Sequence, residues 1–136
     1  MIKPICKDPI ILGQKSVPAV KADMPVVDDL MDTLRANAAR CVGMAANMIG
    51  IPKRIIALSV GPINIPMMNP VITKRAGPYE TEEGCLSLDG VRKTTRYQSI
   101  DVEFYDRSYM KQKQTFTGFP AQIIQHEVDH CDGILI

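Results

Sequence analysis

The chain has 136 residues, enough for a continuous hydrophobic core, so we expect a single domain over residues 1–136. Hydrophobic residues make up 46% and charged residues 23%, near the average of globular proteins, which excludes a disordered or fibrous chain. The net charge of +1 gives no electrostatic attraction to nucleic acid or to an anionic membrane, so we expect a pocket to select the substrate.

Neither the start of the chain nor its cysteines indicate export. The N-terminal stretch MIKPICKDPIILGQ contains no sustained apolar core or small-residue cleavage site, and no later run is as long as a membrane span. The four cysteines, Cys6, Cys41, Cys85 and Cys131, form no CxxC pair and lack the density of a secreted disulfide scaffold. We therefore expect a cytoplasmic protein with reduced thiols and no membrane partner.

The periodicity of apolar residues predicts one helix followed by several strands. Residues 25–40 carry the i, i+3, i+4 stripe of an amphipathic helix, with Asp23 as its cap. Small residues follow at 41–50, where the backbone can approach another segment closely. Short strands are then expected at 54–60, 63–68, 71–74, 100–106 and 114–119. A turn at Asn69–Pro70 separates the second of these strands from the third.

The last expected element is a helix over residues 120–132. Pro120 suits the first turn of a helix, and Gly133 is a typical helix stop. No internal repeat, low-complexity tract or linker divides the sequence. The order of one helix, several strands and a final helix predicts an α+β fold with segregated elements.

This final helix carries the strongest chemical motif of the chain, H-E-x-x-H. His126 and His130 differ by only about 40° around the helix axis, so both rings can reach one ion. Glu127 completes the motif, in which two histidines bind a metal and the glutamate handles the proton of a water molecule. The alternative is that both rings only satisfy hydrogen bonds on a buried face. Because no other histidine occurs in the chain, we interpret the pair as metal ligands.

A catalytic metal site commonly has three protein ligands, so a third ligand is needed. Cys85 is the best candidate, because it follows Gly84 in EEGCLSLDG, among carboxylates that make a plain core role less natural. Cys131 is next to the second histidine but points about 100° away around the helix, which favours packing. Cys6 and Cys41 have no local metal-ligand spacing, and we interpret both as structural.

Three segments together resemble the peptide deformylase family: VGMAA at 42–46, EGCLS at 83–87 and QHEVDH at 125–130. Their order and separation are those of the family, and the resemblance spans essentially the whole chain. It implies a peptide-deformylase-like α+β fold, with small antiparallel or mixed sheets packed around the C-terminal helix. It also implies one catalytic domain over residues 1–136.

The activity implied by the resemblance is removal of the formyl group from the N-terminal formylmethionine of nascent polypeptides, a step of protein biosynthesis. Cys85, His126 and His130 would hold one divalent metal, with iron(II) as the usual ion and zinc, nickel or cobalt as alternatives. Glu127 would be the general acid/base, and the backbone N–H of Leu86 would stabilise the oxyanion. The implied partners are formylated peptide ends, met at the ribosome.

The sequence departs from the family at one chemically important position. The family's GxAAxQ pattern, read onto residues 43–48, puts Met48 where a glutamine side chain ordinarily donates a hydrogen bond to the oxyanion. Methionine cannot donate that bond, and Asn47 comes one residue too early. Loss of one oxyanion donor lowers turnover by about 100- to 1,000-fold, so we expect a slowed enzyme. Cys41 also stands where the family usually has glycine.

The resemblance places further residues near the substrate. Four of them match segments that run beside the substrate backbone, with an ordinary core strand as the alternative: Val42, Gly43, Met44 and Gly84. Ile123 and Arg92 correspond roughly to residues near the pocket for the side chain after formylmethionine. Glu83 and Asp129 are expected to orient the ligands or their neighbours through hydrogen bonds.

Three functions compete. The leading hypothesis is a deformylase with reduced turnover. The second is a catalytically weak or inactive paralogue that binds metal and peptide N-termini, and Met48 is the feature that favours it. The third is an unrelated H-E-x-x-H metalloprotease, which normally takes its third ligand from the helix or from sequence downstream, where only six residues follow His130. The complete ligand set and Glu127 favour the enzyme.

Overall fold

The computed structural model describes residues 1–85 and 87–135. Its elements are α1 (Pro9–Leu12), the 3-10 turn η1 (Lys21–Asp23), α2 (Met24–Ala36), β1 (Gly43–Ala45), the 3-10 turn η2 (Ala46–Ile49), β2 (Ile55–Val60), β3 (Ile63–Cys85), β4 (Leu88–Tyr105), β5 (Lys111–Thr117) and α3 (Gly118–Cys131). The five strands form one sheet in the order β1-β2-β3-β4-β5, and each neighbouring pair is antiparallel. The expected α+β fold is confirmed, with an antiparallel rather than a mixed sheet.

Helix α2 confirms the amphipathic stripe but begins and ends differently from the expectation. Asp23 makes no side-chain cap bond to α2; its carboxylate instead accepts a hydrogen bond of 2.8 Å from the N–H of Val20 and closes the turn η1. The helix ends at Ala36, where the N–H of Asn37 reaches the carbonyl of Thr33 at 3.1 Å. Asp23 therefore occupies the expected N-cap position without making a side-chain cap bond, and the expected helix 25–40 was too long.

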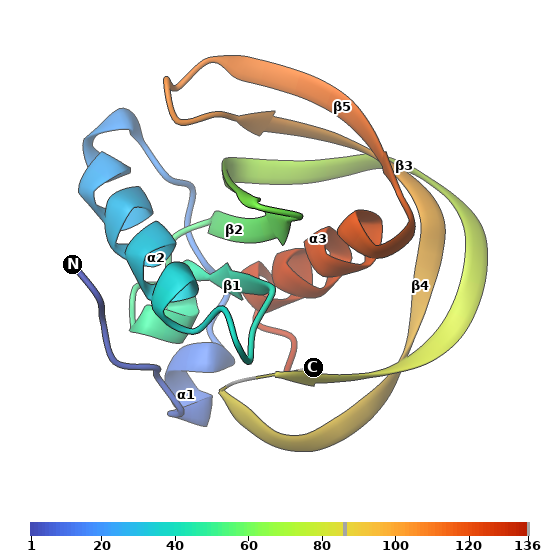
Figure 1. Ribbon diagram of the computed structural model, residues 1–136, viewed down its shortest axis with the longest axis horizontal. Helices are drawn as coiled ribbons and strands as arrows, with labels where there is room; N and C mark the ends of the chain where they lie inside the picture. Colours follow the sequence, from blue (N-terminus) through green and yellow to red (C-terminus); the bar gives the residue numbers. More distant parts are fainter. Residues whose placement is uncertain (86, 136) are drawn as a thin grey trace.

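Strand β2 is buried on both faces, which explains its unbroken apolar sequence. Ile55 and Ala57 pack in a core cluster with residues of α2, whereas Ile56 and Leu58 pack in a second cluster with residues of α3. Figure 1 shows the same arrangement, with α2 and α3 on opposite sides of β1 and β2. Each helix therefore covers one face of the short strands at this end of the sheet.

The two short strands expected at 63–68 and 71–74 belong to one strand, β3. The register with β4 shifts between Met68 and Val71, so the turn expected at Asn69–Pro70 is a bulge within the strand. A bulge bends a strand without ending its pairing. Because turns and bulges contain the same types of residue, the sequence does not tell one from the other. The local sequence therefore located the irregularity but not its type.

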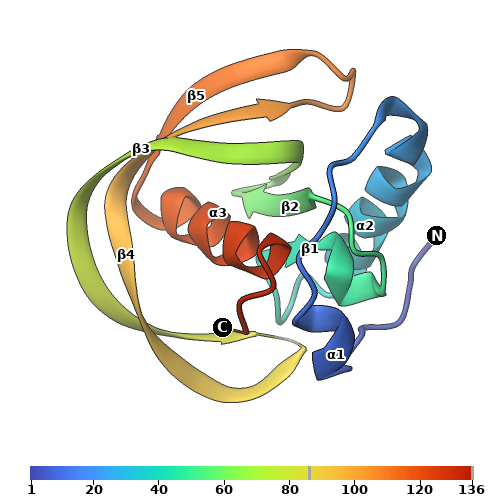
Figure 2. The same ribbon diagram turned by 180° about the vertical axis from the view of Figure 1, so that it is seen from behind.

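This bulge is held by Asn69, which takes a left-handed φ of 51°. Asparagine tolerates that conformation better than most residues. Its side-chain amide exchanges two hydrogen bonds with the backbone of Ala19, of 2.7 and 2.9 Å. Beyond the bulge, β3 and β4 continue as a long and largely exposed hairpin that curves around α3 (Figures 1 and 2).

Helix α3 confirms the expected C-terminal helix and its stop signal. Pro120 lies in the first turn, and Gly133 follows the helix with a left-handed φ of 76°. A side chain at Gly133 would also bring a Cβ within 2.6 Å of the Gly13 carbonyl oxygen, so glycine is required there on two grounds. Within the described ranges, no helix combines the length and the apolar character needed to cross a membrane.

Candidate active site

The two histidines of H-E-x-x-H lie on the buried face of α3, as their spacing predicts. His130 is fully buried and His126 nearly so, and their Nε2 atoms are 3.1 Å apart. Burial, followed by the neighbouring His126, lowers the pKa of His130 to about 3, so its imidazole is neutral and able to ligate. The two rings thus direct their Nε2 atoms into one small volume.

Cys85 supplies a sulfur atom to the same volume from the end of β3. One ligand atom from each of Cys85, His126 and His130 lies within 4.8 Å of the other two. In a tetrahedral site with metal–nitrogen bonds of about 2.0–2.1 Å, two nitrogen ligands are about 3.3 Å apart, close to the separation of the two Nε2 atoms. A thiolate and two imidazoles also form a donor set that suits a divalent transition metal. These residues therefore fit a metal ion, whereas Cys131 is buried in the core cluster beside α3.

Glu127 is buried beside these ligands, with 4% of its surface exposed. Its Oε1 atom has no hydrogen-bond partner among the described residues, and burial raises the pKa of its carboxyl to about 7. The space around it is kept open by Gly43, where an added Cβ would lie 2.9 Å from Oε2 of Glu127 and 2.5 Å from Cγ2 of Ile123. A carboxyl group that can both take and release a proton near neutral pH thus faces the site.

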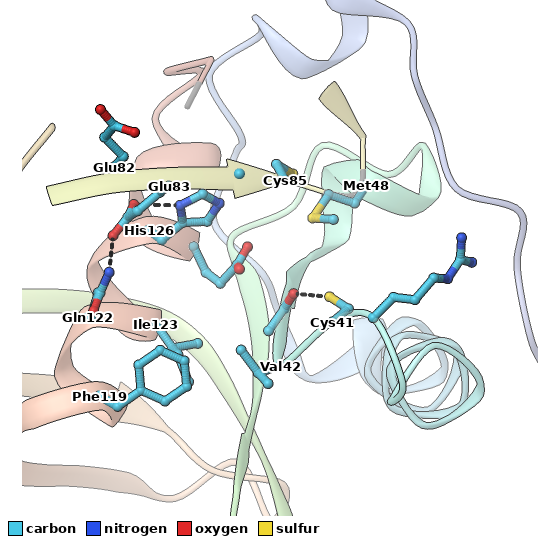
Figure 3. A pocket seen from close by; sticks show the side chains of 14 residues that line it. Cys41, Val42, Met48, Glu82, Glu83, Cys85, Phe119, Gln122, Ile123 and His126 are labelled. Atoms are coloured by element: carbon cyan, nitrogen blue, oxygen red, sulfur yellow. Dashed lines mark hydrogen bonds and ion pairs between the residues drawn. The ribbon is translucent and has the colours of Figure 1, made fainter. Parts of the chain in front are cut away.

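A pocket of about 250 Å³ opens at this point. Figure 3 shows it between the segment that carries Cys41, Val42 and Met48 and the residues of α3, with Cys85 at the end of β3 between them. The lining also includes Phe119, which is largely exposed at the first turn of α3. Cys85, His126 and Glu127 are therefore accessible from one concave surface, and the fully buried His130 lies behind His126.

The residues expected beside the substrate do not all lie there. Val42, Gly43 and Gly84 line the pocket. The side chain of Met44 instead packs in the core with α2, because alternation along β1 turns it to the face opposite Gly43. The backbone N–H expected from Leu86 lies outside the described residues.

Three more expected positions are distributed around the site. Ile123 lines the pocket from α3, as expected. Arg92 is not part of the lining formed by the described residues and lies on β4 opposite Glu83 in the register. Asp129 accepts a hydrogen bond from a buried arginine, Arg96, rather than contacting a ligand through its side chain.

Met48 also lines the pocket and is nearly fully buried. Its sulfur atom is 3.5 Å from the N–H of Ala45, which donates toward it. The side-chain amide of Asn47 points elsewhere: its Nδ2 donates a 2.8 Å hydrogen bond to the carbonyl of His130. Cys41 adds a second sulfur to this side of the pocket, where its thiol donates to the carbonyl of Gly43 at 2.7 Å.

Glu83 joins the expected ligand His126 to two residues that the sequence did not single out, Arg96 and Gln122. Its Oε1 atom lies 2.8 Å from Nδ1 of His126, and its Oε2 atom accepts from Nε2 of Gln122 at 2.9 Å (Figure 3). Burial opposes ionisation of Glu83, but hydrogen bonds from His126, Arg96 and Gln122 outweigh it and lower the pKa to about 2. A buried arginine on a strand carries no local sequence signal, so only the fold reveals this network.

The chain matches the family model of polypeptide deformylase over residues 2–136. It is 62% identical to a peptide deformylase of Clostridium beijerinckii over 136 residues, covering all of both chains, and 41% identical to that of Pelotomaculum thermopropionicum over 123 residues, covering 89% of this chain and 78% of the relative.

Two solved structures are also similar. The Met-Ala-Ser-bound class I type b peptide deformylase of Acinetobacter baumannii has a TM-score of 0.89 at 28% identity, covering 99% of this chain and 97% of that one. The peptide deformylase of Thermus thermophilus has a TM-score of 0.87 at 34% identity, covering 99% and 84%. The chain therefore belongs to the polypeptide deformylase family.

Proposed function

We propose that residues 1–136 act as a single catalytic domain that removes the formyl group from the N-terminal formylmethionine of nascent polypeptides. The observation that carries this proposal is the placement of Glu127, buried without a partner for Oε1 among the described residues, beside the metal-ligating group of Cys85, His126 and His130. Glu127 lines one pocket together with Cys85 and His126. Family membership adds the reaction class, metal-dependent hydrolysis of the formyl amide. We place this activity in the cytoplasm, where chains leave the ribosome.

Cys85, His126 and His130 would hold one divalent ion, with iron(II) as the proposed physiological metal and zinc, nickel or cobalt as substitutes. When bound, the ion supplies Lewis acidity at the formyl oxygen and lowers the pKa of the attacking water. Glu127 takes a proton from that water as the new carbon–oxygen bond forms. It then gives the proton to the nitrogen as the carbon–nitrogen bond breaks, which leaves formate and a free amine.

The peptide would bind along β1, whose outer edge is free because β1 pairs only with β2 in the described sheet. Val42 and Gly43 line the pocket on this edge, and Gly84 lines it on the opposite side, at the end of β3. An extended peptide between them could pair with backbone on both sides. The Acinetobacter baumannii structure bound to Met-Ala-Ser supports binding of such a peptide end.

Turnover would be reduced, because Met48 cannot donate a hydrogen bond to the oxyanion. Asn47 offers no replacement, since its amide is engaged with the carbonyl of His130. The backbone N–H of Leu86 would then act without a side-chain partner. The absence of one such donor lowers the rate by about 100- to 1,000-fold. The same observation supports the second candidate, a paralogue that binds metal and peptide ends without appreciable catalysis.

The test is an anaerobic assay of formate release from formyl-Met-Ala-Ser by the iron-loaded protein and by its Glu127→Gln variant. Glutamine keeps the shape of the side chain but cannot accept and return a proton. We expect turnover in the wild type and a loss of about 10²- to 10⁴-fold in the variant at equal metal content. No formate from a fully loaded wild type would refute the proposed activity and favour the binding paralogue.

A further inference from the structure

One buried arginine, Arg96 on β4, is linked to the metal-ligating group through the carboxylate of Glu83, which contacts His126. Only 4% of its surface is exposed, although a guanidinium is almost never buried without partners. Its Nε donates to the two oxygens of Glu83 at 3.1 and 3.0 Å, and its Nη2 donates to Oε1 at 2.7 Å. On its other side, Nη1 donates to Asp129 at 2.6 Å. Arg96 thus ties β3 and β4 to α3.

The double contact with Glu83 fixes the plane of that carboxylate. The terminal torsion of a glutamate is broad, so a single hydrogen bond leaves the carboxylate free to turn. A guanidinium fork that contacts both oxygens removes this freedom, and a lysine ammonium, as a point charge, does not. Gln122 holds Oε2 from the far side at 2.9 Å, which leaves Oε1 directed at His126.

The orientation of Glu83 determines which nitrogen of His126 faces the site. An ionised carboxylate can only accept, so the contact of 2.8 Å requires Nδ1 of His126 to donate its proton to Oε1. In a neutral imidazole the lone pair is then on Nε2, the atom that lies 3.1 Å from Nε2 of His130. If the carboxylate of Glu83 turned, neither the orientation of the His126 ring nor its tautomer would be fixed.

We propose that Arg96 is a positioning residue of the metal site, which fixes Glu83 so that His126 presents Nε2 to the ion. This inference rests on the proposed function, because it takes His126 as a metal ligand. Arg96 is not among the described residues that line the pocket, and its side chain bonds Glu83 and Asp129 rather than a ligand atom. Its effect is therefore on metal binding first and on formate release only as a consequence.

The test is the dissociation constant for Co²⁺, measured by competition with a chelator, together with the visible spectrum of the cobalt-loaded protein. Arg96→Lys keeps the positive charge but loses the fork. We expect its dissociation constant to rise by about 10- to 100-fold, with shifted cobalt bands. The matched control is Arg75→Lys on the exposed part of β3, for which both readings should equal those of the wild type.

A purely structural arginine would give a different result. In that case Arg96→Lys would lower the free energy of unfolding of the metal-free protein, while its cobalt affinity and spectrum stayed at wild-type values. That outcome would overturn the inference. A second comparison uses the variant Glu83→Gln. If Arg96 acts through Glu83, adding Arg96→Lys to this variant should raise the dissociation constant for Co²⁺ by less than twofold further. Fully additive effects of the two substitutions would show that Arg96 does not act through Glu83.

Formate release from the same samples separates this inference from the proposed function. A wild type that releases formate, combined with unchanged cobalt binding in Arg96→Lys, would refute the role of Arg96 alone. A wild type that binds cobalt but releases no formate would refute the proposed activity alone, and the dissociation constants would still test Arg96. Should Glu83→Gln fail to fold, the affinity and spectrum of Arg96→Lys decide the question.

Discussion

The two walls of the pocket are built in different ways. The α3 wall, formed by α3 and the end of β3, carries Cys85, His126 and Glu127. Here His126 is hydrogen-bonded to Glu83, which Arg96 holds in turn. The β1 wall, formed by residues 41–48, presents two sulfur-containing side chains instead. There the thiol of Cys41 donates to the strand's own carbonyl at Gly43, and Met48 offers no donor.

This difference separates the groups proposed to bind metal and move a proton from those proposed to stabilise the oxyanion. The α3 wall contains the proposed ligands and the proposed base. The β1 wall offers an unpaired strand edge in the described sheet but lacks the amide that the family motif supplies. Changes in the β1 wall are therefore expected to alter turnover without altering metal binding, whereas changes in the α3 wall should alter metal binding.

The largest effect expected from a change in the β1 wall is a gain of rate. Met48→Gln places an amide donor where the sulfur now lines the pocket, so turnover of formyl-Met-Ala-Ser should rise by up to about 100- to 1,000-fold. Met48→Leu is the matched control, since it changes shape without adding a donor and should give no gain. Equal turnover in Met48→Gln and the wild type would show that the oxyanion is stabilised by another group.

The next largest effect is a loss of rate where the two walls meet. Gly43→Ala would place a Cβ 2.9 Å from Oε2 of Glu127 and 2.5 Å from Ile123, so the base must move. A displacement of about 1 Å can lower the rate by about 100-fold, and kcat should carry this loss. Gly84→Ala is the comparison, because its Cβ would meet Gly90 at an ordinary 3.5 Å and should cause a smaller loss. A loss in Gly43→Ala no larger than that in Gly84→Ala would contradict the steric account.

The smallest expected effect concerns the support of α3 by the turn η2. Asn47→Ala removes the fully buried amide that donates to the carbonyl of His130, so the free energy of unfolding should fall by about 1–3 kcal/mol. Urea denaturation measures it, with the exposed Gln114→Ala as a control expected to stay within about 0.5 kcal/mol of the wild type. A loss of formate release at unchanged stability would mean that Asn47 acts in the pocket instead.

The sequence alone predicted which three residues the fold brings together, Cys85, His126 and His130, because their signals are local. His126, Glu127 and His130 lie on one helix, where spacing fixes direction. Cys85 could be chosen over Cys131 on helix geometry and on its neighbours. The direction of Asn47 could not be predicted, because it depends on how η2 packs against the end of α3.

Arg96 was beyond sequence reasoning for a related reason. The residue opposite Arg96 in the register of β3 and β4 is Tyr79, whereas Glu83 is opposite Arg92. Simple pairing rules would therefore have matched Glu83 with the wrong arginine. The contact joins the two strands of the hairpin that curves around α3 (Figure 2). The sequence of long, exposed and polar strand segments does not reveal this curvature.

The most direct test of the central claim is X-ray absorption spectroscopy of the protein loaded with one zinc ion per chain. The account predicts one sulfur neighbour at about 2.3 Å, from Cys85, and two nitrogen neighbours at about 2.0–2.1 Å, from His126 and His130. A spectrum without sulfur, or with two sulfur atoms that would bring in Cys41, would contradict the metal site described for this pocket.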